Sequence, residues 1–189
     1  MKIAKLVALA TGLLVCAPFV NAAGFNYNYA DINVGIYAPT LVGNSGDGYS
    51  VAGSYNVSEN FNLLGNYDFV IINGADVTDL LAGVGYHRPL GESVDLTADV
   101  SYRNATSQGQ IWTGSTVTVG ARFKVSTNAE LRAFVGRTSV SGVTNASGNV
   151  YSVAGTYRIS DKVGFNVTYF NDHDATHWKI LKAGARFEF

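Results

Sequence analysis

The segment 172–177 holds the densest set of residues that could do chemistry. Asp172, His173, Asp174 and His177 place two carboxylates and two imidazoles within six residues. A carboxylate beside an imidazole can activate water for hydrolysis, and the same side chains can ligate a metal ion. Neither signal is specific, because such pairs in a polar loop are usually solvated. Hydrolysis through His173 and His177 is therefore the third hypothesis, and no residue is assigned to catalysis, a metal ion or a cofactor.

Other chemical motifs are not found after residue 22. The sequence there contains no Ser, His and Asp arrangement, no glycine-rich phosphate loop and no cysteine pattern for metal binding. The only cysteine, Cys16, lies before this point, so neither a disulfide nor thiol chemistry is expected. His87, next to Arg88 near an expected turn, is interpreted as a hydrogen-bonded interior residue.

The elements that must position these residues are β-strands. From residue 26 onward apolar and polar residues alternate with a period of two, which predicts strands throughout. We count ten segments, the first at 26–38, each close to the roughly 9 to 11 residues that a tilted strand needs to cross a bilayer. Eight strands remain the alternative. Tight turns are expected at 58–60, 90–93, 126–128 and 160–162, and longer polar links at 39–47, 71–78, 105–114, 141–148 and 173–176.

The alternation leaves open which face points outward, because a soluble ligand-carrying barrel would show the same period. Two further features favour a lipid-facing apolar side. Charges of both signs share the other face, which predicts paired side chains in a narrow lumen. The expected lumen-facing charges are Asp31, Asp68, Asp95, Asp99, Arg103, Arg122, Lys124, Glu130, Arg132, Arg158, Lys182 and Arg186.

Aromatic residues near the segment ends are the second feature. Tyrosine and phenylalanine suit the two water boundaries of a bilayer, although high β-propensity is the competing explanation. The aromatics assigned to the apolar face are Tyr29, Tyr49, Tyr55, Tyr67, Phe69, Tyr86, Tyr102, Phe123, Tyr151, Tyr157, Tyr169, Phe187 and Phe189. Trp112 in the third long link and Trp178 near the last strand are exposed candidates for surface contact.

The first 22 residues have the pattern of a secretory signal peptide. Lys2 and Lys5 precede an apolar run over 6–20, and Ala22 precedes the expected cleavage site. The predicted organisation is a signal peptide at 1–22 and one barrel domain at 23–189. The chain has 13 Lys and Arg against 14 Asp and Glu; without the two leader lysines, 11 basic residues remain and the formal charge is about −3. Nucleic acid is therefore not expected as a partner.

The chain ends in a strand that carries Gly184, Phe187 and Phe189 at its last positions. This ending resembles the assembly signal of outer-membrane β-barrel proteins of Gram-negative bacteria. Together with the alternation, it makes residues 23–189 similar to the small outer-membrane barrel superfamily, whose OmpA and OmpX members have eight strands. The resemblance implies an antiparallel up-and-down transmembrane barrel in the outer membrane. Its implied partners are outer-membrane lipid, the barrel-assembly machinery and an extracellular ligand whose identity the sequence does not give.

The resemblance also bears on the histidine segment. Ten-stranded outer-membrane proteases use acidic and histidine residues at their mouth, but those barrels have taller outer walls and a second acidic pair that is not evident here. The leading hypothesis is therefore a non-enzymatic barrel with a structural or surface-interaction role through its outer loops. A narrow passive pore for small solutes is the alternative, because barrels of about eight strands are filled by side chains and open channels need about 16.

Overall fold

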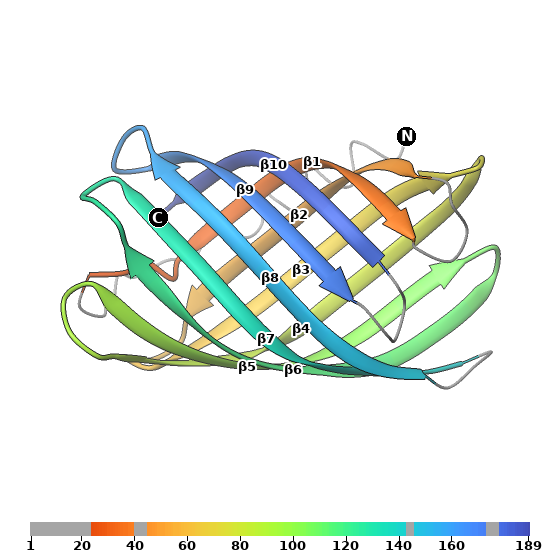
Figure 1. Cartoon of the computed structure of the whole chain (residues 1–189), viewed down its shortest axis with the longest axis horizontal. Helices are drawn as coiled ribbons and strands as arrows, with labels where there is room; N and C mark the ends of the chain where they lie inside the picture. Colours follow the sequence, from red (N-terminus) through yellow and green to blue (C-terminus); the bar gives the residue numbers. More distant parts are fainter. Residues whose placement is uncertain (1–23, 40–44, 143–145, 173–177) are drawn as a thin grey trace.

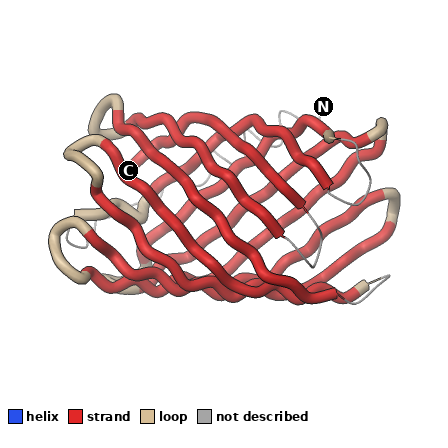
Figure 2. The backbone as a smooth tube through the Cα atoms, viewed as in Figure 1, coloured by secondary structure: helices blue, strands red, loops and turns tan. Residues whose placement is uncertain are grey.

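A computed structural model describes residues 24–39, 45–142, 146–172 and 178–189, which form ten β-strands (Figure 1). The predicted signal peptide at 1–22 and the histidines at 173 and 177 lie outside the described residues, so those predictions remain open. The tube in Figure 2 is strand over nearly its whole course. The strands are β1 (Tyr29–Pro39), β2 (Gly46–Asn56), β3 (Phe61–Ile72), β4 (Ala75–Pro89), β5 (Val94–Ser107), β6 (Gln110–Lys124), β7 (Ala129–Ser141), β8 (Ala146–Arg158), β9 (Val163–Asp172) and β10 (Trp178–Glu188).

The strands form a closed barrel in which every strand is antiparallel to both neighbours. Closure occurs between the first and last strands, where Asn33 on β1 stands opposite Gly184 on β10. Beyond this ladder, the backbone N–H of Phe189 donates to the carbonyl of Asn28 at 3.1 Å. The barrel therefore has no free sheet edge, as lipid requires. The predicted ten-stranded, all-antiparallel barrel is confirmed.

The tight turns lie at one end of the barrel, which we call the turn end. Residues 57–60, 90–93, 125–128 and 159–162 connect the strands there, and the described chain begins and ends there, at the left of Figure 1. In the first of these turns, the N–H of Val57 donates to the carbonyl of Phe61 at 2.9 Å. The longest links, 40–45 and 173–177, join strands at the opposite end. We assign that end to the cell exterior, because outer loops of such barrels are the longer ones, and call it the outer end.

Five long links were predicted at the outer end, and for two of them the predicted length is wrong. The links predicted at 71–78 and 105–114 are two-residue hairpin turns, Asn73-Gly74 and Gln108-Gly109. Both turns have positive φ at both positions, 50° and 78° in the first and 49° and 78° in the second. This is the type I′ geometry that matches strand twist. The flanking strands extend toward water, where an outward side chain need not be apolar, so the alternation that marks a strand fades.

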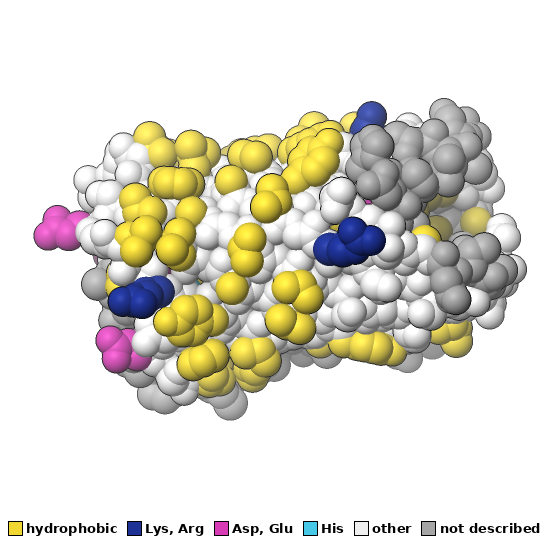
Figure 3. All heavy atoms as spheres, turned by 60° about the horizontal axis from the view of Figure 1, so that its bottom comes forward, with side chains coloured by type: hydrophobic (Ala, Val, Ile, Leu, Met, Phe, Trp, Pro, Cys, Tyr) yellow, Lys and Arg dark blue, Asp and Glu magenta, His cyan; other side chains and the backbone are white. Residues whose placement is uncertain are grey.

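The two faces of the wall differ as the lipid-facing interpretation requires. Outward apolar side chains are exposed, for example Val34 at 68% and Val119 at 56%, whereas Asp31 and Asn33 on the inner face are 6% and 5% exposed. Hydrophobic side chains are spread over the outer wall in Figure 3, and acidic residues gather at the turn end. Outward aromatics pair across strands, as Tyr49 and Phe69 do at 5.1 Å between ring centroids.

The start of the barrel differs from the expectation. The first strand begins at Tyr29 and not at residue 26. Tyr29 itself points into the lumen, where the guanidinium of Arg186 lies 3.8 Å from its ring, so its assignment to the lipid-facing aromatics is wrong. The physical reason is register: Tyr29 is two residues before Asp31 and shares its inner face.

Gly184 in the predicted assembly signal lets β10 approach β1 closely at the closing seam, because it has no side chain. A side chain at this position would meet the carbonyl oxygen of Ile32 and the side chain of Asn33 on β1. We expect Gly184→Val to destabilise the barrel by about 1 to 3 kcal/mol through overpacking. Heat-modifiable gel mobility in a urea series measures this change. Ala183→Val, next along β10 and facing lipid, is the control, and equal loss in both variants would contradict the seam argument.

Candidate functional site in the barrel lumen

Ion pairs line the lumen from one end to the other. At the β1–β10 seam, Arg186 donates two hydrogen bonds of 2.8 Å to the carboxylate of Asp31. Such bidentate pairs are the strong form of an arginine–carboxylate contact. Further toward the outer end, the ammonium of Lys182 lies 2.9 Å from Asp68, which also accepts the hydroxyl of Tyr37 at 2.7 Å. The seam is thus tied by side chains as well as by its backbone ladder.

Arg103 makes the contact that crosses the barrel. Its guanidinium donates to both carboxylate oxygens of Asp79 on β4, at 2.6 to 3.0 Å, and to Asp172 on β9 at 3.4 Å. Since β4 and β9 stand five strands apart in the ring of ten, this contact joins opposite walls. We call Asp68, Asp79, Arg103, Asp172 and Lys182 the partition, because they form one charged layer across the lumen.

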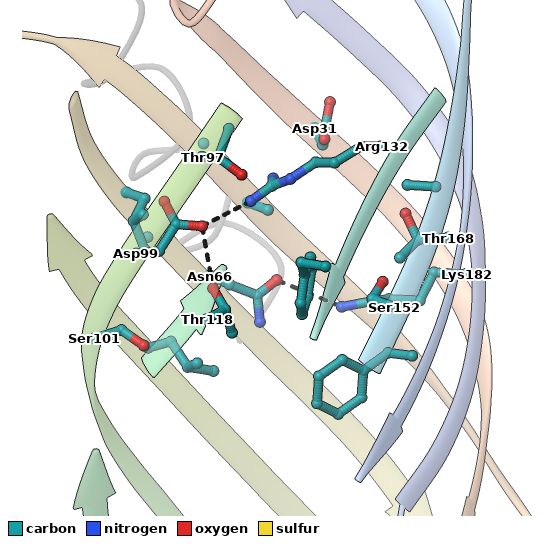
Figure 4. Close-up of a pocket in the computed structure, with 18 of the residues that line it drawn as sticks. Asp31, Asn66, Thr97, Asp99, Ser101, Thr118, Arg132, Ser152, Thr168 and Lys182 are labelled. Carbon is teal, nitrogen blue, oxygen red and sulfur yellow. Dashed lines mark hydrogen bonds and ion pairs between the residues drawn. The ribbon is translucent and has the colours of Figure 1, made fainter. Parts of the chain in front are cut away.

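Further pairs lie toward the turn end. Arg122 donates to Glu130, and the guanidinium of Arg158 approaches the other oxygen of Glu130 at 3.7 Å. Arg132 reaches Asp99 at 3.0 Å, and Thr118 donates to the same carboxylate oxygen at 3.3 Å. Figure 4 shows Asp99, Thr118 and Arg132 joined by these contacts at the edge of a pocket, with Asn66 between Thr118 and Lys182.

Two cavities occupy the lumen on either side of the partition. The central cavity, about 260 Å³, lies toward the turn end and has mostly polar and charged side chains around it. The mouth cavity, about 310 Å³, lies toward the outer end. Both are bounded by Asp68, Asp79, Arg103 and Ile180. The partition is therefore the floor of the mouth cavity and the ceiling of the central one.

The segment 24–28 fills the turn end of the lumen, and we call it the N-terminal plug. Phe25, Tyr27 and Asn28 are 2%, 5% and 1% exposed. The hydroxyl of Tyr27 donates to Asp95 on β5 at 2.7 Å, and its ring stacks on His87 of β4 at 3.8 Å. The segment runs directly into β1, so these contacts also cross the barrel.

Cations of β6 hold the N-terminal plug in place. The guanidinium of Arg122 lies 4.4 Å from the ring of Tyr27 and 5.0 Å from that of Phe25, and it donates to the backbone carbonyl of Asn26 at 3.0 Å. The ammonium of Lys124 lies 5.2 Å from the Phe25 ring. Burial raises the pKa of the Tyr27 phenol well above its ordinary value, and Arg122 opposes this shift. Tyr27 therefore stays a neutral donor to Asp95.

All twelve charges expected in the lumen lie on its inner side. Nine border the central cavity, namely Asp31, Asp68, Asp99, Arg103, Arg122, Glu130, Arg132, Lys182 and Arg186. The other three, Asp95, Lys124 and Arg158, lie at the turn end, where they contact Tyr27, Phe25 and Glu130. Among the assembly-signal residues, Gly184 and Phe187 belong to the β1–β10 ladder and Phe189 extends it.

Several site residues were missed in the sequence. Asp79 fell between an expected link and an expected strand, and Asp172 was grouped with the surface histidines, although it is fully buried against Arg103. Trp112 was expected to be exposed in a link and Trp178 to be exposed near the last strand, but both lie on strands and line the mouth cavity. The position of Asp79 could have been found from strand periodicity. Asp79 lies two residues before Leu81 on β4, so both side chains point to the same inner face.

Two other kinds of feature are absent from the described residues, a membrane-spanning helix and a cluster of metal ligands. No helix in the described ranges is long and apolar enough to span a bilayer. Nor do the described residues include a group of three or more His, Cys, Asp and Glu side chains arranged to hold a metal ion. His87 is fully buried, with its Nδ1 atom 3.5 Å from Asp95.

Comparison with known proteins gives a shared fold. No family model and no curated protein matches the sequence. An outer-membrane channel from Pseudomonas putida F1 aligns with a TM-score of 0.53 at 9% identity, over 92% of this chain and 100% of that one. The KdgM porin gives 0.44 at 10% identity over 87% and 99%, and Neisserial surface protein A gives 0.40 at 15% identity over 85% and 95%.

The fold and the two faces of the wall define the class of this protein. A closed antiparallel barrel with an apolar exterior and a charged interior is an integral outer-membrane β-barrel. The predicted class and outer-membrane location therefore hold. The chain is a small barrel of ten strands, porin-like in architecture, with a lumen crossed by side chains.

Proposed function

We propose that this protein is a non-enzymatic outer-membrane barrel whose lumen is closed and which acts at the cell surface through its outer end. The observation that carries the proposal is that the lumen is crossed twice. Arg103 joins opposite walls at the partition, and the N-terminal plug spans from β1 to β4, β5 and β6 at the turn end. The carboxylates in these two layers contact cationic or hydroxyl groups of the protein itself. This pairing between side chains supports a closed lumen.

A narrow passage is the second candidate function. It is favoured by the position of the two cavities, which lie end to end and share the partition as their common boundary. A shift of the Arg103 side chain would join them. Surface hydrolysis through His173 and His177 is the third, and unchanged surface activity after replacement of both histidines would remove it.

Conductance across a planar bilayer tests the closed lumen. We expect purified native protein to give no reproducible single-channel steps, since both crossing layers are present. The variant Phe25→Ala with Tyr27→Ala removes the rings of the N-terminal plug and should also stay silent, because the partition remains. Steps from native protein would overturn the closed-lumen proposal and favour the passage. Steps only in the variant would show that the N-terminal plug alone closes the lumen.

A further inference from the structure

The inner wall changes character near the outer end. From the turn end to the partition the inward side chains are mostly polar, but above it Tyr37, Val70, Val140 and Ile180 face inward and are 2%, 3%, 5% and 8% exposed. Ile72, Val77, Phe170 and Trp178 pack against Tyr37, Val70 and Ile180. A mouth that held only water would gain nothing from such a lining. Apolar walls with a few polar groups are typical of small-molecule sites.

These side chains leave space between them. The mouth cavity of about 310 Å³ is lined by Tyr37, Val70, Val77, Trp112, Val140 and Trp178 above the charged floor. The rings of Tyr37 and Trp178 meet edge to face, with centroids 6.3 Å apart, so this part of the wall has a fixed shape. A cavity of this size holds a single aromatic or alicyclic ring system and not a folded peptide segment.

The partition, which forms the floor of the mouth cavity, indicates which polar group a ligand there would need. The Nε and Nη2 atoms of Arg103 are used on Asp79, whereas Nη1 has one long contact of 3.4 Å to Asp172. A guanidinium nitrogen with a long contact retains donor capacity, so the floor offers an N–H to an oxygen acceptor. Three carboxylates, Asp68, Asp79 and Asp172, surround this donor and disfavour an anion.

We propose that the mouth cavity binds a small neutral ring compound that bears one oxygen acceptor, with the ring between Trp112 and Trp178 and the oxygen toward Arg103. This inference rests on the proposed action at the outer end and names its ligand class. Its test is independent of the closed lumen, because conductance reports on passage and binding reports on the cavity.

Intrinsic fluorescence reports directly on the site, because the chain has 2 tryptophans and both line the mouth cavity. The probe is 4-bromobenzyl alcohol, a neutral ring with one hydroxyl and a bromine that quenches tryptophan on contact. With folded protein in detergent we expect saturable quenching with a midpoint on the order of 10⁻⁴ M, as suits so small a ligand. Partition into micelles alone gives quenching that rises linearly. Absence of saturation with native protein overturns the proposal.

A matched pair of variants on β5 locates the binding. Ala105 borders the mouth cavity, whereas Ala98 on the same strand is exposed on the outer wall. Ala105→Phe should weaken saturable quenching at least tenfold by filling the cavity, and Ala98→Phe should leave it unchanged. Heat-modifiable gel mobility checks that both variants are folded. Equal quenching in the two variants would place the probe in the micelle and overturn the proposal.

Two other probes test the ligand class. 4-Bromobenzoate, an anion of the same size, should bind at least tenfold more weakly than the alcohol because of the carboxylates in the floor. Saturable quenching by a brominated fatty acid but not by the ring alcohol would assign the mouth cavity to an acyl chain and overturn the proposal.

Discussion

Replacing Arg103 with methionine is expected to lower the free energy of unfolding by about 3 to 5 kcal/mol. Methionine keeps much of the side-chain volume, so the loss of stability arises from removal of the positive charge and not from a cavity. Asp79 and Asp172 have side chains 15% and 0% exposed, and both would lose the guanidinium that they face. Urea unfolding of the barrel in lipid vesicles, followed by gel mobility, measures the change.

Arg137→Met is the matched control for this experiment. Arg137 lies on β7 on the exposed side of the wall and donates to Ser147 at 2.9 Å, so its replacement should change stability by less than about 0.5 kcal/mol. Arg103→Lys should fall between the two, because an ammonium keeps the charge but loses the bidentate geometry. If Arg103→Met were as stable as Arg137→Met, the partition would contribute nothing to the fold.

Arginine on the lipid-facing side should be nearly as costly. Val119 on β6 is 56% exposed on the outer wall, and Val119→Arg is expected to cost about 2 to 4 kcal/mol if this position lies near the bilayer midplane. The neighbouring Thr118 points inward and borders the central cavity beside Asp99. Thr118→Arg can therefore place its charge against a carboxylate, and its cost should be smaller. The same urea series in vesicles compares the two, and equal cost would contradict the assignment of the two faces.

The barrel fold could be predicted from the sequence, because a strand between lipid and lumen alternates apolar and polar residues with a period of two. Val117, Val119 and Phe123 on one face and Thr118 and Arg122 on the other are sufficient to predict β6 and its orientation. The strand count followed from the same alternation. Where the strands rise beyond the apolar wall, as around Asn73 and Gln108, this constraint weakens and the prediction failed.

The site was harder to predict, because its contacts join residues far apart in the chain. Arg103 meets Asp172 across 69 positions, and Arg122 meets the backbone of Asn26 across 96. Alternation gives the inward face of each of these residues but not its partner, which depends on strand stagger around the ring. The apolar residues that line the mouth cavity were not predicted either, because alternation does not show where an inward position is apolar. Val70 and Val140 stand at inward positions, where the period-two pattern led us to expect polar side chains, and Val77 fell within the link expected at 71–78.

The hairpins Asn73-Gly74 and Gln108-Gly109 have a consequence for any macromolecule that contacts the rim at the outer end. They keep β3, β4, β5 and β6 paired up to their last residues, so this arc is a rigid ledge already in its final shape. A macromolecule that docks there would not have to freeze a loose loop, a step that costs about 0.5 to 1.5 kcal/mol for each immobilised long side chain. Contacts with this ledge can therefore be small and still be selective.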